Sequence, residues 1–329
     1  MSSKKKKIYT YLGKVILITL LIVFCVRTFF VESYTMSSSQ MESTLMEGDR
    51  IFIDKTAYGI RLPVTLLTVP FTFDNLFGLK SYSSLIQIPY SRIGESMIER
   101  NDIVMFNNPM ETDKPLDKGS LILSRCVGLP GDTLEMKQGY IFIDGLEYIG
   151  SPDRMDEYVI KTEDGREVKN ILEDENIPLR DFVFRNDSVF LYLTKLEAFI
   201  LGEYLNDSIE VNPVLDSVTD FKFLIPYKGK IIDINDRNLL VYKQIIQLEE
   251  KEANVNIEDK RLTINGKAIT EYTFKDDYYW MLSDNTLNAV DSRSLGFIPF
   301  KNVIGKATYI WYSSDEEKPR WNRCFNRIN

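Results

Sequence analysis

The chain has 329 residues, which suffices for one large domain or two smaller ones, and its hydrophobic content of 44% is that of an ordinary globular protein. The net charge is −8, but the first 27 residues hold six basic side chains and no acidic one, so the remainder holds 34 basic and 48 acidic residues. Because nucleic-acid binding depends on neutralising phosphates, a region this acidic excludes nucleic acid as an expected partner.

The N-terminal segment has the composition of a membrane anchor. Apolar residues dominate Ile8–Val31, but the unbroken run, Val15–Val26, has only 12 residues, whereas a membrane-spanning helix needs about 20. Lys14 and Arg27 flank this run and can extend their charged ends to the interface, which restores the length. A cleaved signal peptide has an apolar core of similar length, but no small-x-small cleavage site follows the run. We therefore expect an uncleaved transmembrane helix at 9–30.

The charges before this helix predict its orientation. Lys4, Lys5, Lys6 and Lys7 lie in the preceding tail, 1–8, and such clusters stay on the cytoplasmic side of a membrane. We expect the chain to cross the membrane once, with its bulk on the extracytoplasmic side and with membrane lipid as one contact.

Strand patterns dominate the rest of the chain. Alternating or apolar runs lie at Arg50–Asp54, Asp102–Phe106, Tyr140–Ile143, Arg261–Ile264 and Thr308–Tyr312. The dipeptides Asp144-Gly145 and Asn265-Gly266, which follow two of these runs, are favoured two-residue hairpin turns. Helical periodicity is weak outside the anchor and a segment near Leu193–Leu205. We expect a mainly β fold of antiparallel sheets.

Two long segments lack an assignable motif. Leu62–Tyr90 is rich in large apolar side chains, with Asp74 and Lys80 as its only charges. It is either part of the core or a surface that dips into the bilayer, and we favour the surface. Residues 151–251 are highly charged, but aromatic and β-branched residues recur throughout, which predicts a folded inserted subdomain.

Three short motifs carry the functional argument. The first is the polar loop Met36–Asp49, the second is Arg125–Asp132, and the third is Ser283–Arg293, followed by Gly296–Pro299. In this order, behind a membrane anchor, they resemble the motifs of bacterial type I signal peptidases, which are membrane-bound serine proteases with a Ser-Lys dyad. The resemblance extends from about 27 to 313.

The resemblance implies the fold, location and ligands of that family. We expect the signal peptidase fold, with its core in two parts at 31–150 and 252–315, and a C-terminal tail at 316–329. The location is then the bacterial cytoplasmic membrane. The implied partners are a signal peptide or exported preprotein, or another membrane protein such as an active paralogue. No cofactor and no metal are implied.

The resemblance also locates the reactive groups of the family, and each is replaced in this chain. The nucleophilic serine stands immediately before the methionine of the first motif, which is position Gln40 here. The lysine base stands immediately before the arginine of the second motif, which is Ser124. The hydroxyl that supports the lysine stands two residues before the aspartate of the third motif, which is Ala289.

These replacements predict a catalytically inactive protein. An amide is no nucleophile at neutral pH, and a serine hydroxyl is no general base. Ser39 would need a base of its own, and the chain has no histidine to form a Ser-His pair. One alternative is an active signal peptidase whose catalytic route does not use these positions, and the other is a purely structural surface protein.

The residues around the replaced positions have two expected roles. The family binds an extended peptide along sheet edges, a mode that relies on backbone groups and small pockets. The expected peptide-binding residues are Ser38, Met41 and Leu45. Charged residues of the second and third motifs are expected to tie the site together through ion pairs. These structural residues are Arg125, Asp284, Asp291 and Arg293.

Three cysteines complete the chemical inventory. Cys25 lies in the anchor, whereas Cys126 and Cys324 lie in the outer region, where a disulfide is chemically permitted. Spacing alone does not decide between a disulfide and two free or buried thiols.

Overall fold

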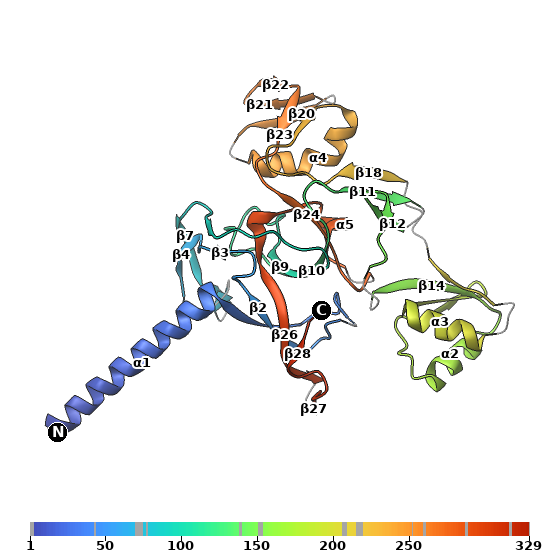
Figure 1. Cartoon of the computed structure of the whole chain (residues 1–329), viewed down its shortest axis with the longest axis horizontal. Helices are drawn as coiled ribbons and strands as arrows, with labels where there is room; N and C mark the ends of the chain where they lie inside the picture. Colours follow the sequence, from blue (N-terminus) through green and yellow to red (C-terminus); the bar gives the residue numbers. More distant parts are fainter. Residues whose placement is uncertain are drawn as a thin grey trace.

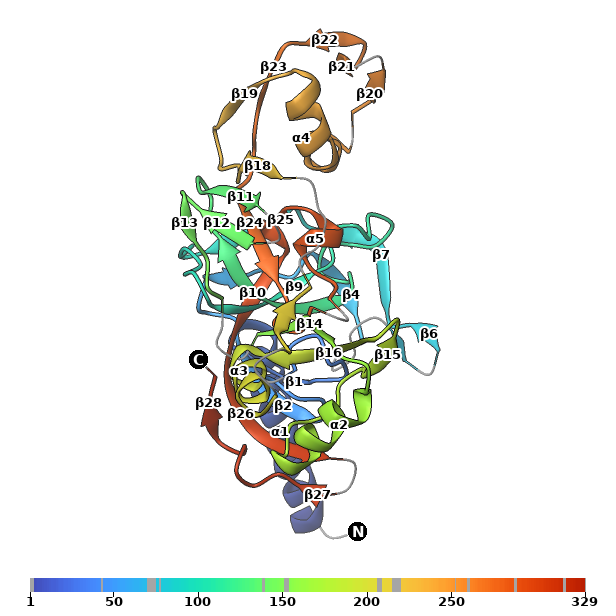
Figure 2. The same ribbon diagram turned by 90° about the vertical axis from the view of Figure 1, so that its right-hand side faces the viewer.

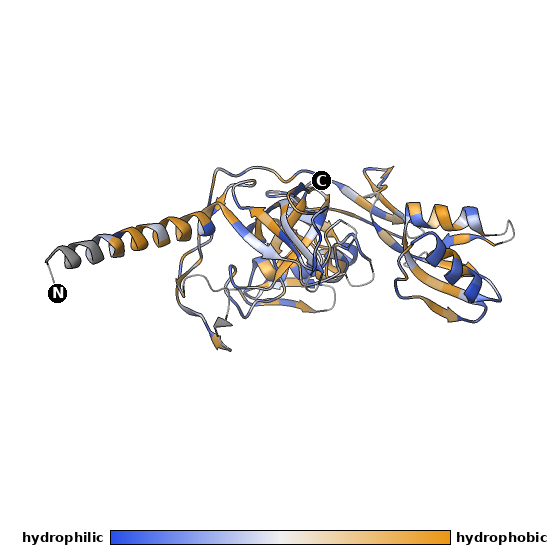
Figure 3. Ribbon diagram, turned by 90° about the horizontal axis from the view of Figure 1, so that it is seen from below, coloured by the Kyte–Doolittle hydropathy of each residue, from blue (hydrophilic) through white to orange (hydrophobic). Residues whose placement is uncertain are grey.

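The structure is a computed structural model that describes residues 3–42, 44–69, 75–76, 78–137, 140–150, 154–205, 209–214, 220–251, 253–258, 261–286, 289–315 and 318–328. One long helix, α1 (Ser3–Phe29), projects from a body of antiparallel strands (Figure 1). Its stretch Thr10–Phe29 is long and apolar enough to cross a membrane, and none of it is buried inside the molecule. Figure 3 shows mostly hydrophobic residues along this stretch of the helix, which extends away from the body.

The largest sheet forms the centre of the body and positions all three motifs. Its strands, in spatial order, are β1 (Val31–Thr35), β2 (Asp49–Asp54), β26 (Val303–Asp315), β9 (Ile103–Asn107), β10 (Leu121–Gly128), β24 (Tyr278–Leu282) and β25 (Ile298–Pro299). The short strands β27 (Lys318–Pro319) and β28 (Asn326–Arg327) also pair with β26. The predicted antiparallel, mainly β fold is confirmed, as are the strands expected near 50–54, 102–106 and 308–312.

Strands β9 and β10 are buried on both faces because apolar residues occupy both sides of the pleat. Ile103, Met105 and Leu123 join one core cluster, which contains the first motif. Val104 and Ile122 join a second cluster on the opposite face. Successive side chains of a strand point to opposite faces, so this alternation divides the side chains of β10 between the two clusters.

A second group of strands extends the body beyond β24 (Figure 2). One sheet has the order β13 (Leu146–Glu147), β12 (Tyr140–Ile143), β11 (Thr133–Lys137), β18 (Phe221–Leu224). Nearby lie α4 (Asp236–Glu249), the pair β19 (Ile231–Asp233) and β23 (Glu271–Thr273), and the sheet β20 (Val255–Glu258), β21 (Arg261–Ile264), β22 (Lys267–Ile269). Both predicted hairpin turns are confirmed: φ is 51° and 82° at Asp144 and Gly145, and 51° and 77° at Asn265 and Gly266.

A separate unit projects from the body with its own core. Its sheet has the order β15 (Val183–Arg185), β16 (Ser188–Thr194), β14 (Met155–Lys161), β17 (Val211–Pro213), packed with α2 (Gly165–Asp174) and α3 (Lys195–Tyr204). The segment expected as one insertion, 151–251, thus supplies this unit and also β18, β19 and α4, whose buried residues join the core around β11 and β12.

Two helices of the outer region were not identified from helical periodicity. Helix α3 lies where a helical pattern was expected, but α2 and α4 were missed. Both begin at ordinary capping residues: the Asp164 side chain accepts a bond from the Arg166 amide, and the Asn235 side chain accepts one from the Asn238 amide. Helix α2 buries Gly165, Val168 and Leu172, whose i, i+3, i+7 spacing is that of one helix face, so its amphipathic pattern was present in the sequence and was overlooked.

The apolar stretch 62–90 forms small strand pairs on the surface near the end of α1. Strand β3 (Ile60–Arg61) pairs with β8 (Arg92–Ile93), β4 (Thr65–Thr68) with β7 (Tyr82–Gln87), and β5 (Asn75–Leu76) with β6 (Leu79–Lys80). The exposed fractions of Leu66, Leu79 and Leu85 are 52%, 75% and 88%, so these side chains are not core. The stretch 70–74 and residue 77 lie outside the described residues. Membrane contact stays a prediction.

We expect a probe at Leu85 to lie in the bilayer interface. In a Cys25→Ser, Cys126→Ser, Cys324→Ser background, Leu85→Cys labelled with an environment-sensitive fluorophore should show blue-shifted emission in vesicles, because exposed aliphatic side chains partition into the interface. Leu146→Cys is the matched control, since Leu146 is 77% exposed on β13. Equal emission from both positions, insensitive to lipid-borne quencher, would mean that Leu85 lies in water.

The cysteines are free thiols, so the disulfide alternative is wrong for this structure. Cys126 is fully buried, and burial, followed by the charge of Asp102, raises the pKa of its thiol. Cys324 is partly exposed.

We expect a maleimide to modify Cys324 in the native protein and to leave Cys126 unmodified even at pH about 9, where an ordinary thiol is largely ionised. Mass spectrometry of the digested protein checks this, and rapid modification of Cys126 without unfolding would contradict it.

Candidate functional site

The loop of the first motif is held in place by core packing and by hydrogen bonds from the third motif. Met41 and Leu45 have no exposed surface and pack in the cluster that contains Leu123. Asn285, in the third motif, donates from its backbone N–H to the Gln40 carbonyl (3.0 Å) and from Nδ2 to the Ser39 carbonyl (3.0 Å). Together these contacts fix the backbone at position 40.

The side chain of Gln40 binds the backbone of the second motif. Its Nε2 donates to the Leu123 carbonyl oxygen at 2.7 Å, and only 9% of Gln40 is exposed. This bond joins Gln40 to the residue that directly precedes Ser124 along β10.

The Leu123 carbonyl lies on an open strand edge. The Cys126 N–H and carbonyl bond to Asp102 and Asn101, beside β9, and backbone groups of successive residues in a strand face opposite edges. Leu123 therefore faces away from β9. Strand β24 pairs with β10 only from Arg125 onward, and no strand among the described residues pairs with the other edge of β10 at Leu121–Ser124. The Gln40 amide caps this open edge.

The Ser124 side chain is enclosed by protein, and its hydroxyl does not ionise near neutral pH. The residue is fully buried, and its Oγ has no hydrogen-bond partner among the described residues. By the alternation of β10, its side chain lies on the face of Ile122 and Cys126. Ala289 is partly exposed in the loop before α5 (Ser292–Leu295). Among positions 40, 124 and 289 the only hydroxyl is the buried one of Ser124, and none of the three side chains is a base near pH 7.

A buried ion pair joins the second motif to the third. Arg125 donates from Nε to Asp284 Oδ1 at 2.9 Å and from Nη2 to Asp284 Oδ2 at 2.7 Å, and both side chains are about 95% buried. Thr44, from the first motif, donates to Asp284 Oδ2 at 2.7 Å, and Arg125 Nη1 also donates to the Asn101 carbonyl at 2.9 Å. This bidentate geometry links all three motifs through one carboxylate.

A second ion pair shapes the turn of the third motif. Asp291 is fully buried and caps α5 by accepting from the Arg293 backbone N–H at 3.0 Å. It also accepts from Arg293 Nη2 at 2.8 Å and from the Ser283 backbone N–H at 2.9 Å. These contacts are those of a structural role, because every bond is local to the motif or to β24.

The C-terminal segment contributes contacts that sequence reasoning missed. Arg323 donates to Asp49 Oδ2 at 2.6 Å and to the Thr44 carbonyl at 3.0 Å, and Arg320 Nη2 lies 3.7 Å from Asp49 Oδ1. Asp49 is fully buried at the end of the first motif. The sequence signals that could have predicted these contacts are the Gly48-Asp49 pair at the end of the first motif and the two arginines, Arg320 and Arg323. The segment expected as a tail thus closes over the loop of the first motif.

Strand β14 also contacts the site. Met155, fully buried, forms a parallel bridge with Asn285, donating to the Asp284 carbonyl at 2.9 Å and accepting from the Thr286 backbone N–H at 3.3 Å. The projecting unit is therefore attached at the loop that holds Gln40.

Comparison with known proteins decides the family. The model of the family described as signal peptidase, peptidase S26, matches residues 9–209 and 224–312, which include all three motifs. The chain belongs to this family. The resemblance seen in the motifs is thereby confirmed.

Individual members of the signal peptidase family are distant relatives. Signal peptidase I of Buchnera aphidicola subsp. Baizongia pistaciae is 28% identical over 328 residues, covering 97% of this chain and 83% of that protein. Signal peptidase I of Haemophilus influenzae is 24% identical over 308 residues, covering 93% and 70%. A crystal structure of a signal peptidase I from Enterococcus faecalis matches 64% of this chain and 97% of its own, with 15% identity and a TM-score of 0.26.

Proposed function

We propose that this chain is a membrane-anchored, catalytically inactive signal peptidase family protein that binds an extended segment of an exported polypeptide. The observation that carries the proposal is the pair of replaced positions: the Gln40 amide caps the backbone where a nucleophile is expected, and Ser124 is buried where a base is expected. The binding surface survives while the chemistry is lost.

The proposed inactivity rests on the absence of a lysine at position 124, where the family's base is expected. A Ser-Lys mechanism needs a neutral lysine, whose pKa burial lowers, within reach of the serine. Position 124 holds a hydroxyl, and Arg125 next to it donates to Asp284 and does not accept protons near pH 7. Lys306, on β26, forms an ion pair with Asp102 at 2.5 Å, which favours its charged form over the neutral form that a base requires.

The peptide-binding part of the proposal rests on the open edge of β10. An added strand would bond to the outward-facing backbone groups of Leu121 and Leu123, as in β-augmentation. The peptide must displace the Gln40 amide from the Leu123 carbonyl, so Gln40 acts as a competing cap. Ser38, which is exposed, can contact such a strand. Met41 and Leu45, fully buried, support the site from beneath.

The proposed location follows from α1 and its flanking charges. The tail holds Lys4–Lys7 and no acidic residue, and a cytoplasmic tail places the body on the extracytoplasmic side of the bacterial cytoplasmic membrane. Signal peptides and the exported segments that follow them are then within reach. The names of the two relatives, both signal peptidase I, are consistent with signal peptides as the ligand.

The test is photo-crosslinking of a signal peptide that carries a benzophenone beside its cleavage region. We expect crosslinks to residues 36–45 and 121–124 of the full-length protein in detergent. Gln40→Ala should raise the peptide affinity by roughly fivefold, because the competing hydrogen bond contributes about 1 kcal/mol. Gln247→Ala, an exposed glutamine on α4, is the matched control and should change nothing. Crosslinks confined to other regions, or an affinity that falls in Gln40→Ala, would contradict the proposed edge.

A further inference from the structure

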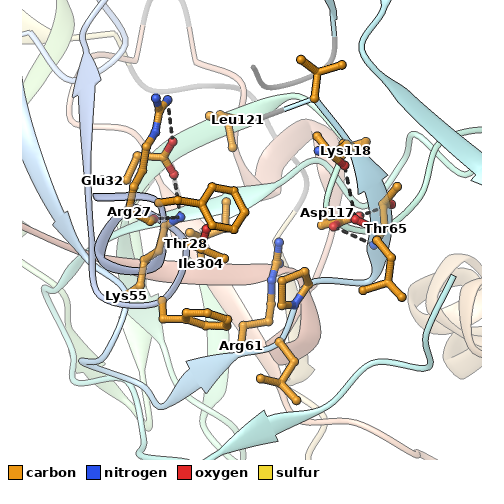
Figure 4. A pocket seen from close by; sticks show the side chains of 17 residues that line it. Arg27, Thr28, Glu32, Lys55, Arg61, Thr65, Asp117, Lys118, Leu121 and Ile304 are labelled. Atoms are coloured by element: carbon orange, nitrogen blue, oxygen red, sulfur yellow. Dashed lines mark hydrogen bonds and ion pairs between the residues drawn. The ribbon is translucent and has the colours of Figure 1, made fainter. Parts of the chain in front are cut away.

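A cavity of about 380 Å³ lies where the anchor meets the body (Figure 4). One wall is the C-terminal end of α1, from Phe24 to Phe29, and another is strand β4 with the residues that precede it. The stretch Thr10–Phe29 is the candidate membrane span. The cavity therefore opens at the level where a spanning helix leaves the hydrocarbon region, and a cavity of this size accommodates a small ligand or headgroup.

The lining of this cavity carries an excess of positive charge. Four basic residues, Arg27, Lys55, Arg61 and Lys118, line it with two acidic ones, Glu32 and Asp117. With both carboxylates counted, the formal net charge of the lining is +2. Burial, followed by the charge of Arg92, lowers the pKa of Arg61 to about 10, and the Arg61 guanidinium donates to Asn107 Oδ1 at 2.7 Å.

The two carboxylates are already committed to protein groups. Glu32 bridges Arg27 at 3.3 Å and Lys55 at 2.7 Å. Asp117 accepts from the Thr65 backbone N–H at 3.0 Å and from Thr65 Oγ1 at 2.7 Å. Figure 4 shows these two clusters on opposite sides of the cavity. Lys118 is 6% exposed, with Nζ 5.6 Å from the centroid of the Tyr82 ring.

The remaining wall is apolar and continues onto the exposed surface. Phe24, Leu66, Val69, Leu121 and Ile304 line the cavity. Leu66 and Val69 are 52% and 44% exposed. A ligand that fits both walls combines a phosphate-like anion with hydrocarbon. Free phosphate or a nucleotide would match only the basic residues of the cavity and not its apolar wall.

We propose that this cavity binds the headgroup of one anionic phospholipid, with its phosphodiester among the basic residues and its acyl chains along Phe24, Leu66 and Val69. The inference rests on the membrane anchoring proposed above. Basic pockets beside membrane-spanning helices suit such headgroups. The bound lipid contacts both α1 and β4, so it fixes the body relative to the anchor and to the bilayer.

The experiment uses the full-length protein reconstituted in phosphatidylcholine vesicles that contain photoactivatable phosphatidylglycerol. We expect label on peptides covering 24–32 and 62–69. Lys55→Gln with Lys118→Gln should reduce this label at least tenfold, because each basic charge near an anionic lipid contributes a factor of about five. Leu66→Glu places a repelling charge at an exposed position of the lining and should reduce the label without disturbing the fold.

The matched control is Lys161→Gln with Lys169→Gln, which removes the same charge from exposed positions of the projecting unit. It should label like the unmodified protein. Photoactivatable phosphatidylcholine that labels these peptides equally, or label that survives both pocket variants, overturns the site. Loss of label with excess soluble glycerol phosphate identifies a phosphate site and overturns the lipid assignment. Protein that floats with vesicles but shows no lipid preference overturns this inference alone, whereas protein that does not float overturns the anchoring as well.

Discussion

Replacing Asp284 by alanine is expected to lower the free energy of unfolding by about 3–5 kcal/mol, the typical cost of leaving a buried charge without its partner. Arg125 donates two bonds to this carboxylate, at 2.9 and 2.7 Å, and Thr44 donates a third at 2.7 Å. Since these bonds connect the three motifs, the loss should also loosen the loop around Gln40. Denaturant unfolding of the full-length protein in detergent measures the effect.

Two comparisons separate the ion pair from a general effect of substitution. The double variant Arg125→Leu, Asp284→Leu should be more stable than Asp284→Ala, because it removes the uncompensated charge. Glu173→Ala breaks an exposed pair with Lys169 on α2, with atoms 3.7 Å apart, and should change the stability little. A double variant no more stable than the single one would show that the pair is not the origin of the loss.

The second large effect is expected from rebuilding the reactive groups. The triple variant Gln40→Ser, Ser124→Lys, Ala289→Ser should cleave a signal peptide, whereas the unmodified protein should not. Gln40 bonds the carbonyl of Leu123, the residue before Ser124, so the long side chain of a lysine at position 124 has only a short distance to cover. Position 124 is fully buried, so the pKa of a lysine introduced there should fall toward that of a general base. A nucleophile and base together contribute on the order of 10⁴-fold or more in rate.

The single variants provide the contrast for this prediction. Gln40→Ser alone gives a hydroxyl without a base, and Ser124→Lys alone gives a base without a nucleophile, so neither should cleave. Circular dichroism shows whether each variant is folded, since a buried lysine carries a desolvation cost. Cleavage by Ser124→Lys alone would show that the nucleophile lies elsewhere. A folded triple variant that binds peptide and does not cleave would mean that more than these three groups has been lost.

Much of the fold was predictable because its signals are local. Alternation marked β2 and β26, an apolar run marked β9, and the Asp-Gly and Asn-Gly dipeptides marked two hairpins, since each depends on neighbouring residues only. Helix α4 was also locally encoded: its buried residues Leu239, Tyr242 and Ile246 have helical spacing, but the surrounding charge obscured it.

The motif spacing predicts which residues stand at the family's reactive positions, but not the contacts that these residues make. The bond from Gln40 to Leu123 joins residues 83 apart in sequence, and the bonds from Arg323 to Asp49 join residues 274 apart. Such pairs depend on how the sheet brings distant segments together, and no local pattern encodes that. The cap on the strand edge and the closure of the loop by the C-terminal segment therefore required the structure.

The most direct test of the central claim is processing of a preprotein by the unmodified protein. The full-length chain, reconstituted in vesicles, is incubated with a preprotein that an active type I signal peptidase cleaves in a parallel reaction. We expect no mature product above the rate seen with empty vesicles. Processing by the unmodified protein that persists in Gln40→Ala would contradict it, because the catalytic groups would then lie outside the positions assigned here.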